Sequence, residues 1–484
     1  MIQDTTTNQP SRKWVLFVAI LVLADITSGI ESTMIYSAMK ELIAIYGDAA
    51  NVGWLVTGYV LVSAAAAAIF GRLGDIYGRK RMVIIVLACA VIGSLISAMT
   101  RELTVMILGR ALQGVAGAIM PLSFGLAREV IPVRRLPLAI GILYSAGAIG
   151  GMVGMVLGGV LVDAGGWHWI FLVSAMVAGL SLIFAAVLLP RGPVATNPGR
   201  IDKLGGILFV PAVAAMLLGL TNVRLWGLLD MRILALLIGG MALFIIWLRY
   251  EWRHPQPLID VRLFTRRELL AAMACMALFA GGGAQVMQLQ MLFLQQPVST
   301  GIGLGLTATL AGLLMMAPNL SATLMAPVAG HIAGSRGNRF VVICGFMLNA
   351  TGWLLLTTFN SNIWIVMTIT SLACMAGNAL LGVGIYNSVI AAAPFDRTSE
   401  AGGVVTVVRG LSHAVSAQII MVILAHSTVA GSAGAGHPAP IGYLTVFAFI
   451  AGLSLIGILL ATRLRGRPDR PAEALQTGVE PAHV

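Results

Sequence analysis

Residues 71–81 read Gly-Arg-Leu-Gly-Asp-Ile-Tyr-Gly-Arg-Lys-Arg, a charged loop with spaced glycines between two long apolar segments. Where two hydrophobic helices turn within about ten residues, glycines allow the close backbone approach that the turn needs. Cations that follow the turn favour a cytoplasmic position for it. Asp75 is an acid in a basic loop, so we expect it to pair with an arginine or to lie at the positive N-terminus of the next helix.

The composition of the whole chain indicates a membrane protein. Of its 484 residues, 58% are hydrophobic and only 10% are charged, and the mean hydropathy is +0.93. A water-soluble core does not have this composition, so the lipid bilayer is the predicted solvent. The net charge of +11 comes from cations in short loops and a tail, so we expect no nucleic-acid partner.

Several classes of chemistry are not supported. The four cysteines, Cys89, Cys275, Cys344 and Cys374, lie inside apolar segments without C-x-x-C spacing, so neither disulfides nor metal binding is expected. The seven histidines lack metal-ligand spacing, and the chain has no phosphate-binding G-x-x-x-x-G-K-[ST] motif. We therefore expect no enzyme, no metal and no cofactor.

Apolar segments long enough to cross a bilayer recur along the chain. A span needs about 20 apolar residues, and we place fourteen, near 14–38, 52–70, 82–100, 103–127, 138–162, 168–190, 204–221, 231–250, 269–293, 308–333, 340–359, 363–391, 404–429 and 440–463. With both termini in the cytoplasm, all but six of the 30 lysines and arginines fall on the cytoplasmic side. This asymmetry supports an even number of spans.

A weak internal repeat divides the chain. Residues 330–339, Gly-His-Ile-Ala-Gly-Ser-Arg-Gly-Asn-Arg, repeat two glycines of the loop at 71–81 but lack its acid. Aligning the loops pairs spans 1–6 with spans 9–14 and leaves spans 7–8 as an insertion. The expected organisation is a cytoplasmic N-terminus, a six-helix bundle, cytoplasmic loops with two inserted spans, a second six-helix bundle and a disordered cytoplasmic tail, at 1–13, 14–190, 191–268, 269–463 and 464–484.

The loop at 71–81 resembles the loop between the second and third spans of the major facilitator superfamily. The resemblance implies an all-α fold of two six-helix bundles, here with two inserted spans. It also implies a conformational latch that holds one face of the protein closed. The latch residues would be Gly71, Gly74, Asp75, Gly78 and Arg79. The alternative is a short basic turn that only fixes topology.

Span 4 carries a buried cation. Residues 108–117 match the family pattern R-x-x-Q-G-x-x-G, which falls on Arg110, Gln113, Gly114 and Gly117. A charge near the centre of a membrane helix costs ~2.5–3.5 kcal/mol and is kept only when it is paired or faces water. We expect Arg110 to pair with Glu31 or Asp25, either as an exchanging switch or as a static structural pair.

Span 1 carries two acids. Asp25 lies about 16 Å along the helix from its start, close to the midplane, and Glu31 lies further out. Residues 31–40 resemble the span-1 signature of the 14-span drug:proton antiporters, with Glu31 in place of the family's aspartate and Lys40 in place of its proline. Burial disfavours the charged form of a carboxylate, which lets it bind and release a proton. Either acid is a candidate for proton coupling.

Span 5 resembles the antiporter signature G-x-x-x-G-P-x-x-G-G. Its glycines Gly150, Gly154, Gly158 and Gly159 permit tight helix packing, and Met155 occupies the place of the proline.

The expected substrate cavity combines amide and thioether groups, which suit a promiscuous pocket. In the major facilitator arrangement, spans 9 and 12 would contribute Gln285, Met287, Gln288, Met291, Asn378, Tyr386 and Asn387. The glutamines could equally tie helices together.

The chain is therefore expected to be a monomeric, multi-pass protein of the bacterial cytoplasmic membrane. The resemblance implies proton-coupled export of lipophilic, cationic small molecules by alternating access, a multidrug efflux activity. The alternatives are a narrow-specificity transporter of a lipid, siderophore or metabolite, by antiport or symport, and a membrane scaffold or sensor that transports nothing.

Overall fold

The computed structural model describes residues 12–46, 49–190, 202–227, 229–255, 257, 259, 261–296, 298, 304–306, 308–426, 428–429 and 437–464. The predicted tail at 464–484 and the N-terminal segment at 1–13 lie almost wholly outside these ranges. Within them the chain is nearly all helical, as expected for apolar segments whose backbone groups must be satisfied internally.

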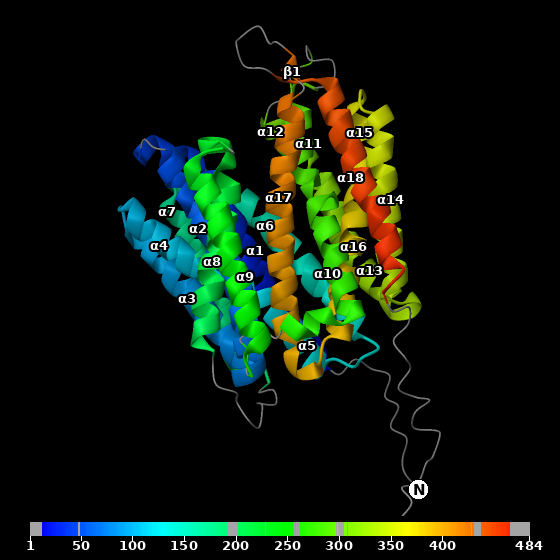
Figure 1. Ribbon diagram of the computed structural model, residues 1–484. Helices are drawn as coiled ribbons and strands as arrows, with labels where there is room; N and C mark the ends of the chain where they lie inside the picture. Colours follow the sequence, from blue (N-terminus) through cyan, green and yellow to red (C-terminus); the bar gives the residue numbers. More distant parts are fainter. Residues whose placement is uncertain are drawn as a thin grey trace, which may run out of the picture.

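The first half of the protein is a group of long helices, drawn from blue to cyan in Figure 1. Its elements are α1 (Arg12–Tyr46), α2 (Ala49–Tyr77), α3 (Arg79–Met99), α4 (Leu103–Gly114), η1 (Val115–Ala118), α5 (Ile119–Val130), α6 (Leu136–Gly165) and α7 (His168–Leu188). The helix predicted at 103–127 is interrupted by η1, a short 3₁₀ segment that follows Gly114 and contains Gly117, the two glycines of the span-4 motif.

The second half is a similar group, preceded by two further helices. The two are α8 (Lys203–Trp226) and α9 (Met231–Arg253), followed by η2 (Val261–Thr265). The group itself consists of α10 (Arg267–Gly281), η3 (Gly283–Gln285), α11 (Val286–Gln295), α12 (Ala308–Leu314), α13 (Met316–Arg336), α14 (Asn338–Thr358), α15 (Ile363–Ile369), η5 (Thr370–Met375), α16 (Ala376–Ala392), η6 (Phe395–Arg397), α17 (Thr398–His426) and α18 (Pro440–Ala461). Two short strands, β1 (Thr428–Val429) and β2 (His437–Pro438), pair antiparallel between α17 and α18.

Every predicted span overlaps a helix. In the part of the chain that the structure describes, twelve helices are long and apolar enough to cross a membrane, which makes the chain a multi-pass integral membrane protein. The other two predictions, near 204–221 and 308–333, fall on α8, whose apolar stretch Leu204–Leu220 is shorter, and on α12 with α13.

The two halves meet along two helix pairs that are related by the internal repeat. α2 packs against α17, and α6 packs against α13. Glycines make both approaches close. A Cβ on Gly141 of α6 would lie 2.5 Å from the carbonyl oxygen of Ala326, and one on Gly330 of α13 would collide with the carbonyl oxygen of Pro137. The repeated loop at 330–339 therefore begins at an interface between the halves.

The inserted helices α8 and α9 pack against each other and lie beside α2 and α17, in front of the bundle in Figure 1. A buried polar cluster joins them at one end. Asp202 caps α8 by accepting a hydrogen bond from Gly205 and another from the Tyr250 hydroxyl at 3.0 Å. Trp247 donates to Glu251 on α9, also at 3.0 Å. Polar contacts thus join α8 to α9, and apolar side chains pack the pair against the bundle.

Candidate functional site

The turn between α2 and α3 places the charged loop at one end of the bundle. Gly78 has a φ of 95°, a conformation that glycine adopts readily, and it reverses the chain so that Arg79 begins α3. The side chain of Arg79 points back into the protein and is buried, with 4% of its surface exposed. A buried guanidinium needs several acceptors, and the helix ends around it supply them.

Asp75 joins this loop to the other half of the protein. Its carboxylate accepts hydrogen bonds from the main-chain N–H groups of Ser399 at 3.3 Å and Glu400 at 2.8 Å. These groups belong to the first turn of α17, where N–H groups have no partner within the helix. Of the two contacts expected for Asp75 as alternatives, the one with a helix N-terminus is present, but the helix is α17 and not the next helix along the chain.

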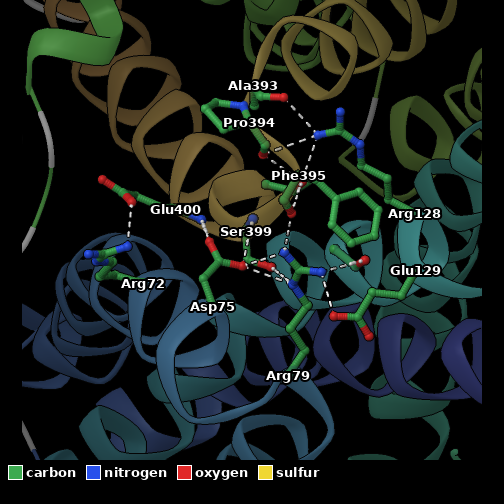
Figure 2. Close-up of polar contacts among 12 residues, drawn as sticks. Arg72, Asp75, Arg79, Arg128, Glu129, Ala393, Pro394, Phe395, Ser399 and Glu400 are labelled. Carbon is green, nitrogen blue, oxygen red and sulfur yellow. Dashed lines mark hydrogen bonds and ion pairs between the residues drawn. The ribbon is translucent and has the colours of Figure 1, made fainter. Parts of the chain in front are cut away.

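Arg79 lies at the centre of the contacts in Figure 2. It forms ion pairs with Asp75 at 2.7 Å and with Glu129 of α5 at 2.6 Å. It also donates to the carbonyl oxygen of Phe395 at 3.0 Å and to the hydroxyl of Ser399 at 3.0 Å. One guanidinium thus connects α2, α3 and α5 of the first half to η6 and α17 of the second.

Two further arginines extend this arrangement. Arg72 pairs with Glu400 at 3.3 Å, and Arg128 donates to the hydroxyl of Thr398 at 2.7 Å and to the carbonyl oxygen of Ala393 at 2.9 Å. We call the whole set the charged network; it consists of Arg72, Asp75, Arg79, Arg128, Glu129, Ala393, Phe395, Thr398, Ser399 and Glu400 (Figure 2). The charged network joins the two halves at this end of the molecule.

The loop glycines make this contact possible. A Cβ on Gly71 would lie 2.5 Å from the carbonyl oxygen of Ser399, and one on Gly74 would collide with Leu122. Gly403 on α17 faces α2 in the same way, because its Cβ would collide with the carbonyl oxygen of Ala67 and lie 2.8 Å from the Cα of Ala68.

Arg110 is buried near Glu31, but the expected ion pair with an acid of α1 is not formed. Among the described residues, Arg110 donates to the main-chain carbonyl oxygens of Leu55 at 3.1 Å and Glu31 at 2.9 Å, and to the side chain of Gln113 at 2.9 Å. Its guanidinium carbon lies 4.5 Å from the ring centroid of Tyr59. The prediction of a direct carboxylate partner was wrong for this structure, because Nε and Nη1 donate to main-chain and amide oxygens instead. Nη2 is buried without a partner among the described residues.

The rest of the span-4 motif brings helices together. The side chain of Gln113 accepts a hydrogen bond from Arg110 and donates one to the hydroxyl of Ser94 at 2.5 Å. A Cβ on Gly114 would lie 2.6 Å from the carbonyl oxygen of Tyr59, and one on Gly117 would collide with the side chain of Ser63. These residues therefore fix α2 and α3 against α4 and η1.

The two acids of α1 occupy separate buried positions. Glu31 is 1% exposed; one carboxylate oxygen accepts a hydrogen bond from the Ser174 hydroxyl at 3.3 Å, and Oε2 has no partner within the described residues. Asp25 is 3% exposed and lies near Ser123, and its Oδ2 is likewise buried without a partner in the part of the chain that is described. The structure brings Glu31 close to Arg110 and leaves Asp25 nearer α5.

The glycines of span 5 lie along α1. A Cβ on Gly150 would lie 2.8 Å from the Cα of Ile26, one on Gly154 would lie 2.8 Å from the Cα of Ile30, and one on Gly158 would lie 3.0 Å from the carbonyl oxygen of Met34. Gly159 faces open space instead. Three of the four predicted positions thus set the spacing between α6 and α1.

The residues predicted to line a substrate cavity are dispersed. Gln285 donates to the carbonyl oxygen of His413 at 2.8 Å, and Asn378 donates to that of Gly283 at 2.8 Å, so both brace the break between α10 and α11. Tyr386 packs against Phe124 at 5.2 Å between the halves, and Asn387 donates within α16 to Val383 at 3.0 Å.

The remaining predicted residues lie on α11. The sulfur of Met287 accepts a contact from Asn319 at 3.8 Å, and the side chain of Met291 lies outside the described part. Among the predicted residues whose side chains are described, Gln288 lines a cavity of the structure and the others are absent from its lining.

This cavity lies between α2, α8 and α17 and has a volume of about 500 Å³. Val56, Val60 and Leu61 of α2 and Leu217 and Leu220 of α8 give it apolar walls. Its polar side chains are Thr57, Gln288, Arg409 and His413. The inserted helix α8 therefore forms one wall, a role that its sequence did not indicate.

Several residues of the site were missed. Glu129, Ser399 and Glu400 complete the charged network, and Arg409 and His413 of α17 line the cavity. The acids after span 4 and at the start of span 13 were visible signals, but nothing in the sequence indicates a pairing between segments more than 300 residues apart.

Two groups of long membrane helices, held together at one end by the charged network, define the fold class of a multi-pass membrane protein. Comparison with known proteins identifies the family: the Major Facilitator Superfamily model matches residues 21–417. The chain belongs to this superfamily, whose members are transporters and not enzymes.

Among characterised relatives, a "multidrug resistance protein B homolog" of Mycobacterium tuberculosis is 32% identical over 345 residues, which are 69% of this chain and 61% of the relative. A "probable actinorhodin transporter" of Streptomyces coelicolor is 27% identical over 427 residues, 85% of this chain and 72% of the relative. The structure of a proton:xylose symporter superposes with a TM-score of 0.64 at 14% identity, over 93% of this chain and 95% of that one, which shows a shared fold.

Proposed function

We propose that the protein exports lipophilic small molecules in exchange for protons across the bacterial cytoplasmic membrane. In this proposal the chain has fourteen spans with both termini in the cytoplasm, and the halves at 14–190 and 269–463 rock against each other around the insertion. The names of its relatives, which include multidrug resistance proteins, support export over uptake.

The observation that carries the proposal is the buried carboxylate of Glu31. It lies in a membrane helix with Oε2 unpartnered among the described residues, and Nη2 of the nearby cation Arg110 is likewise buried without a partner among them, although its Nη1 donates to the main-chain oxygen of Glu31. An acid in such a place is costly and marks a proton or substrate pathway by default. Taking up and releasing a proton as the surroundings change is the chemistry that coupling requires.

The charged network supplies the conformational part of the cycle. Its ion pairs and helix-end contacts hold the halves together at one end, so the opposite end is the open one in this state. Alternating access requires that these contacts break when the other end closes. In this proposal the network is a cytoplasmic latch, and the structure represents its closed state.

The expectation of a cationic substrate came from the resemblance to the drug:proton antiporters. Neither Asp25 nor Glu31 lines the cavity, and its charged side chain is Arg409. We therefore propose a lipophilic substrate, and the efflux assay below determines whether it is a cation or an anion.

The test is efflux from proteoliposomes that contain the purified full-length protein, driven by an imposed pH gradient. Two fluorescent substrates, ethidium as a cation and 11-(dansylamino)undecanoate as an anion, are compared in wild type, Glu31→Gln and Asp25→Asn. We expect gradient-driven movement of at least one substrate, lost in Glu31→Gln. Unchanged coupling in Glu31→Gln with loss in Asp25→Asn would move the proton site to Asp25, and coupling that survives both changes would contradict the proposal.

A narrow-specificity exporter is the second candidate, favoured by the similarity to a probable actinorhodin transporter. Competition separates the two: a multidrug exporter is inhibited by many unrelated lipophilic molecules, whereas a narrow one responds to a single chemical series. Absence of gradient-driven movement for every compound in a broad panel would favour a scaffold or sensor.

A further inference from the structure

Arg409 is a charged side chain in the middle of α17 that the proposed cycle does not use. It lies eleven residues from the start of the helix at Thr398, which is about 16 Å along it. Its guanidinium lies beside the hydroxyl groups of Tyr386 and Tyr144. Within the described residues, no carboxylate lies within 4.0 Å of it. Phenol groups offer hydrogen bonds but no negative charge.

The surroundings of Arg409 form a site for a molecule. It lines the cavity of about 500 Å³ together with His413, one helical turn further on, and Gln288 of α11. None of the described lining residues is Asp or Glu. Gln288 of α11 and Arg409 and His413 of α17 are polar, while α2 and α8 offer mainly aliphatic side chains, with the Thr57 hydroxyl of α2 as the exception. The cavity is therefore polar and cationic on one side and apolar on the other.

A positive charge at this depth is retained when an anion or water pairs with it. The charged side chains of the network are engaged with one another at the far end of α17, so they do not supply this partner. We propose that the cavity binds an amphipathic molecule whose carboxylate or phosphate group pairs with Arg409 and whose apolar body lies between α2 and α8.

Each part of the site has a part of the ligand to recognise. Arg409 provides the fork of donors that fits a carboxylate or phosphate, and Gln288 and His413 add donors beside it. Leu217 and Leu220 of α8 contact the apolar body, which gives the inserted helix a role in binding. The ligand is a transported molecule or an anionic lipid of the bilayer, since both present this chemistry.

The inference deepens the proposed function, and rests on it only where the ligand is a transported molecule. It is tested by binding alone, without a gradient. The probes are 11-(dansylamino)undecanoic acid and its methyl ester, which differ only in the charged group. Their binding to the purified full-length protein in a neutral detergent is followed by energy transfer from tryptophan to the dansyl group.

We expect wild type to bind the acid more tightly than the ester. Arg409→Gln should weaken binding of the acid about tenfold or more, the effect of losing charge-assisted hydrogen bonds, and leave the ester unchanged. Arg409→Lys should retain part of the preference. Gly410→Leu adds a side chain where a Cβ meets nothing within 4 Å, and should weaken both probes equally. Equal binding of acid and ester by wild type, or a preference that survives Arg409→Gln, would overturn the inference.

Separate experiments test whether each variant is folded and whether the ligand is a lipid or a transported molecule. Arg232→Gln, at the start of α9 and away from the cavity, should bind as wild type, and a melting temperature for each variant shows that it is folded. Extraction of co-purified lipid tests the source. An anionic lipid that accompanies wild type but not Arg409→Gln, and that displaces the acid probe, identifies a lipid site. Gradient-driven movement of the acid probe identifies a substrate site. Loss of coupling in Glu31→Gln with normal acid binding would separate the two proposals.

Discussion

The carboxylate of Asp75, at the end of α2, accepts a hydrogen bond at 2.8 Å from the main-chain N–H of Glu400, which lies 325 residues further along the chain. The same carboxylate pairs with Arg79 at 2.7 Å. An acid that neutralises a buried cation and also caps a helix of the other half makes closure of this end depend on one side chain.

Replacing Asp75 by Asn should open this end of the protein more often and slow transport. Asparagine keeps the shape but removes the charge that pairs with Arg79, and breaking a buried ion pair costs about 3–5 kcal/mol. Distances between spin labels on α2 and α17 at the network end should lengthen, with transport at least about tenfold slower. Arg81→Gln, an exposed charge in the same loop, is the control. Wild-type distances and turnover in Asp75→Asn would remove the latch assignment.

Gly71→Ala should force α2 away from α17. Its Cβ would lie 2.5 Å from the carbonyl oxygen of Ser399, and overpacking of this kind costs about 1–3 kcal/mol. Disulfide cross-linking between cysteines introduced on the two helices should slow. Gly53→Ala on the same α2, where a Cβ meets nothing within 4 Å, should cross-link at the wild-type rate; equal rates in both variants would show that the glycine is not needed for closure.

Arg110 and Glu31 should show weak coupling in stability. Because Arg110 bonds the main-chain carbonyl of Glu31, a double-mutant cycle of Arg110→Gln and Glu31→Gln should give an interaction free energy below about 1 kcal/mol. Thermal unfolding of the two single variants and the double variant measures it. A value of about 2 kcal/mol or more would show that the two side chains pair directly in another state of the cycle.

Gly205→Ala should disturb the inserted pair of helices. Its Cβ would collide with Glu251 and lie 2.6 Å from the carboxylate of Asp202, so the polar cluster that joins α8 to α9 must shift. We expect a lower melting temperature and weaker binding of both dansyl probes, since α8 forms a wall of the cavity. Gly239→Ala on α9, which meets nothing within 4 Å, should leave both unchanged.

The positions of the spans and of the charged loop could be predicted from local features. Apolar length predicts the helices, but the loop expected at 71–81 is mostly helical: α2 continues to Tyr77, Arg79 begins α3, and only Gly78 lies between them. The glycines Gly150, Gly154 and Gly158 predicted close packing because their spacing places them on one face of a helix. Each of these signals is contained in a short stretch of chain and does not depend on what lies beside it.

Partners across the fold could not be predicted in this way. Asp75 binds main-chain N–H groups, which every residue but proline carries, so the sequence around Ser399 and Glu400 holds no specific sign of the contact. Arg110 likewise bonds carbonyl oxygens, which explains why the prediction of a carboxylate partner was wrong.

The sequence by itself determined that this chain is a helical membrane protein with a charged, glycine-rich turn, because bilayer burial selects composition and length residue by residue. The tertiary structure alone decided that the N-terminus of α17 would donate hydrogen bonds to Asp75, and that the cavity lined by Arg409 would lie between α2, α8 and α17. Those outcomes depend on how helices far apart in sequence pack, and the packing is set by the combined shape of many small contacts that no single stretch contains.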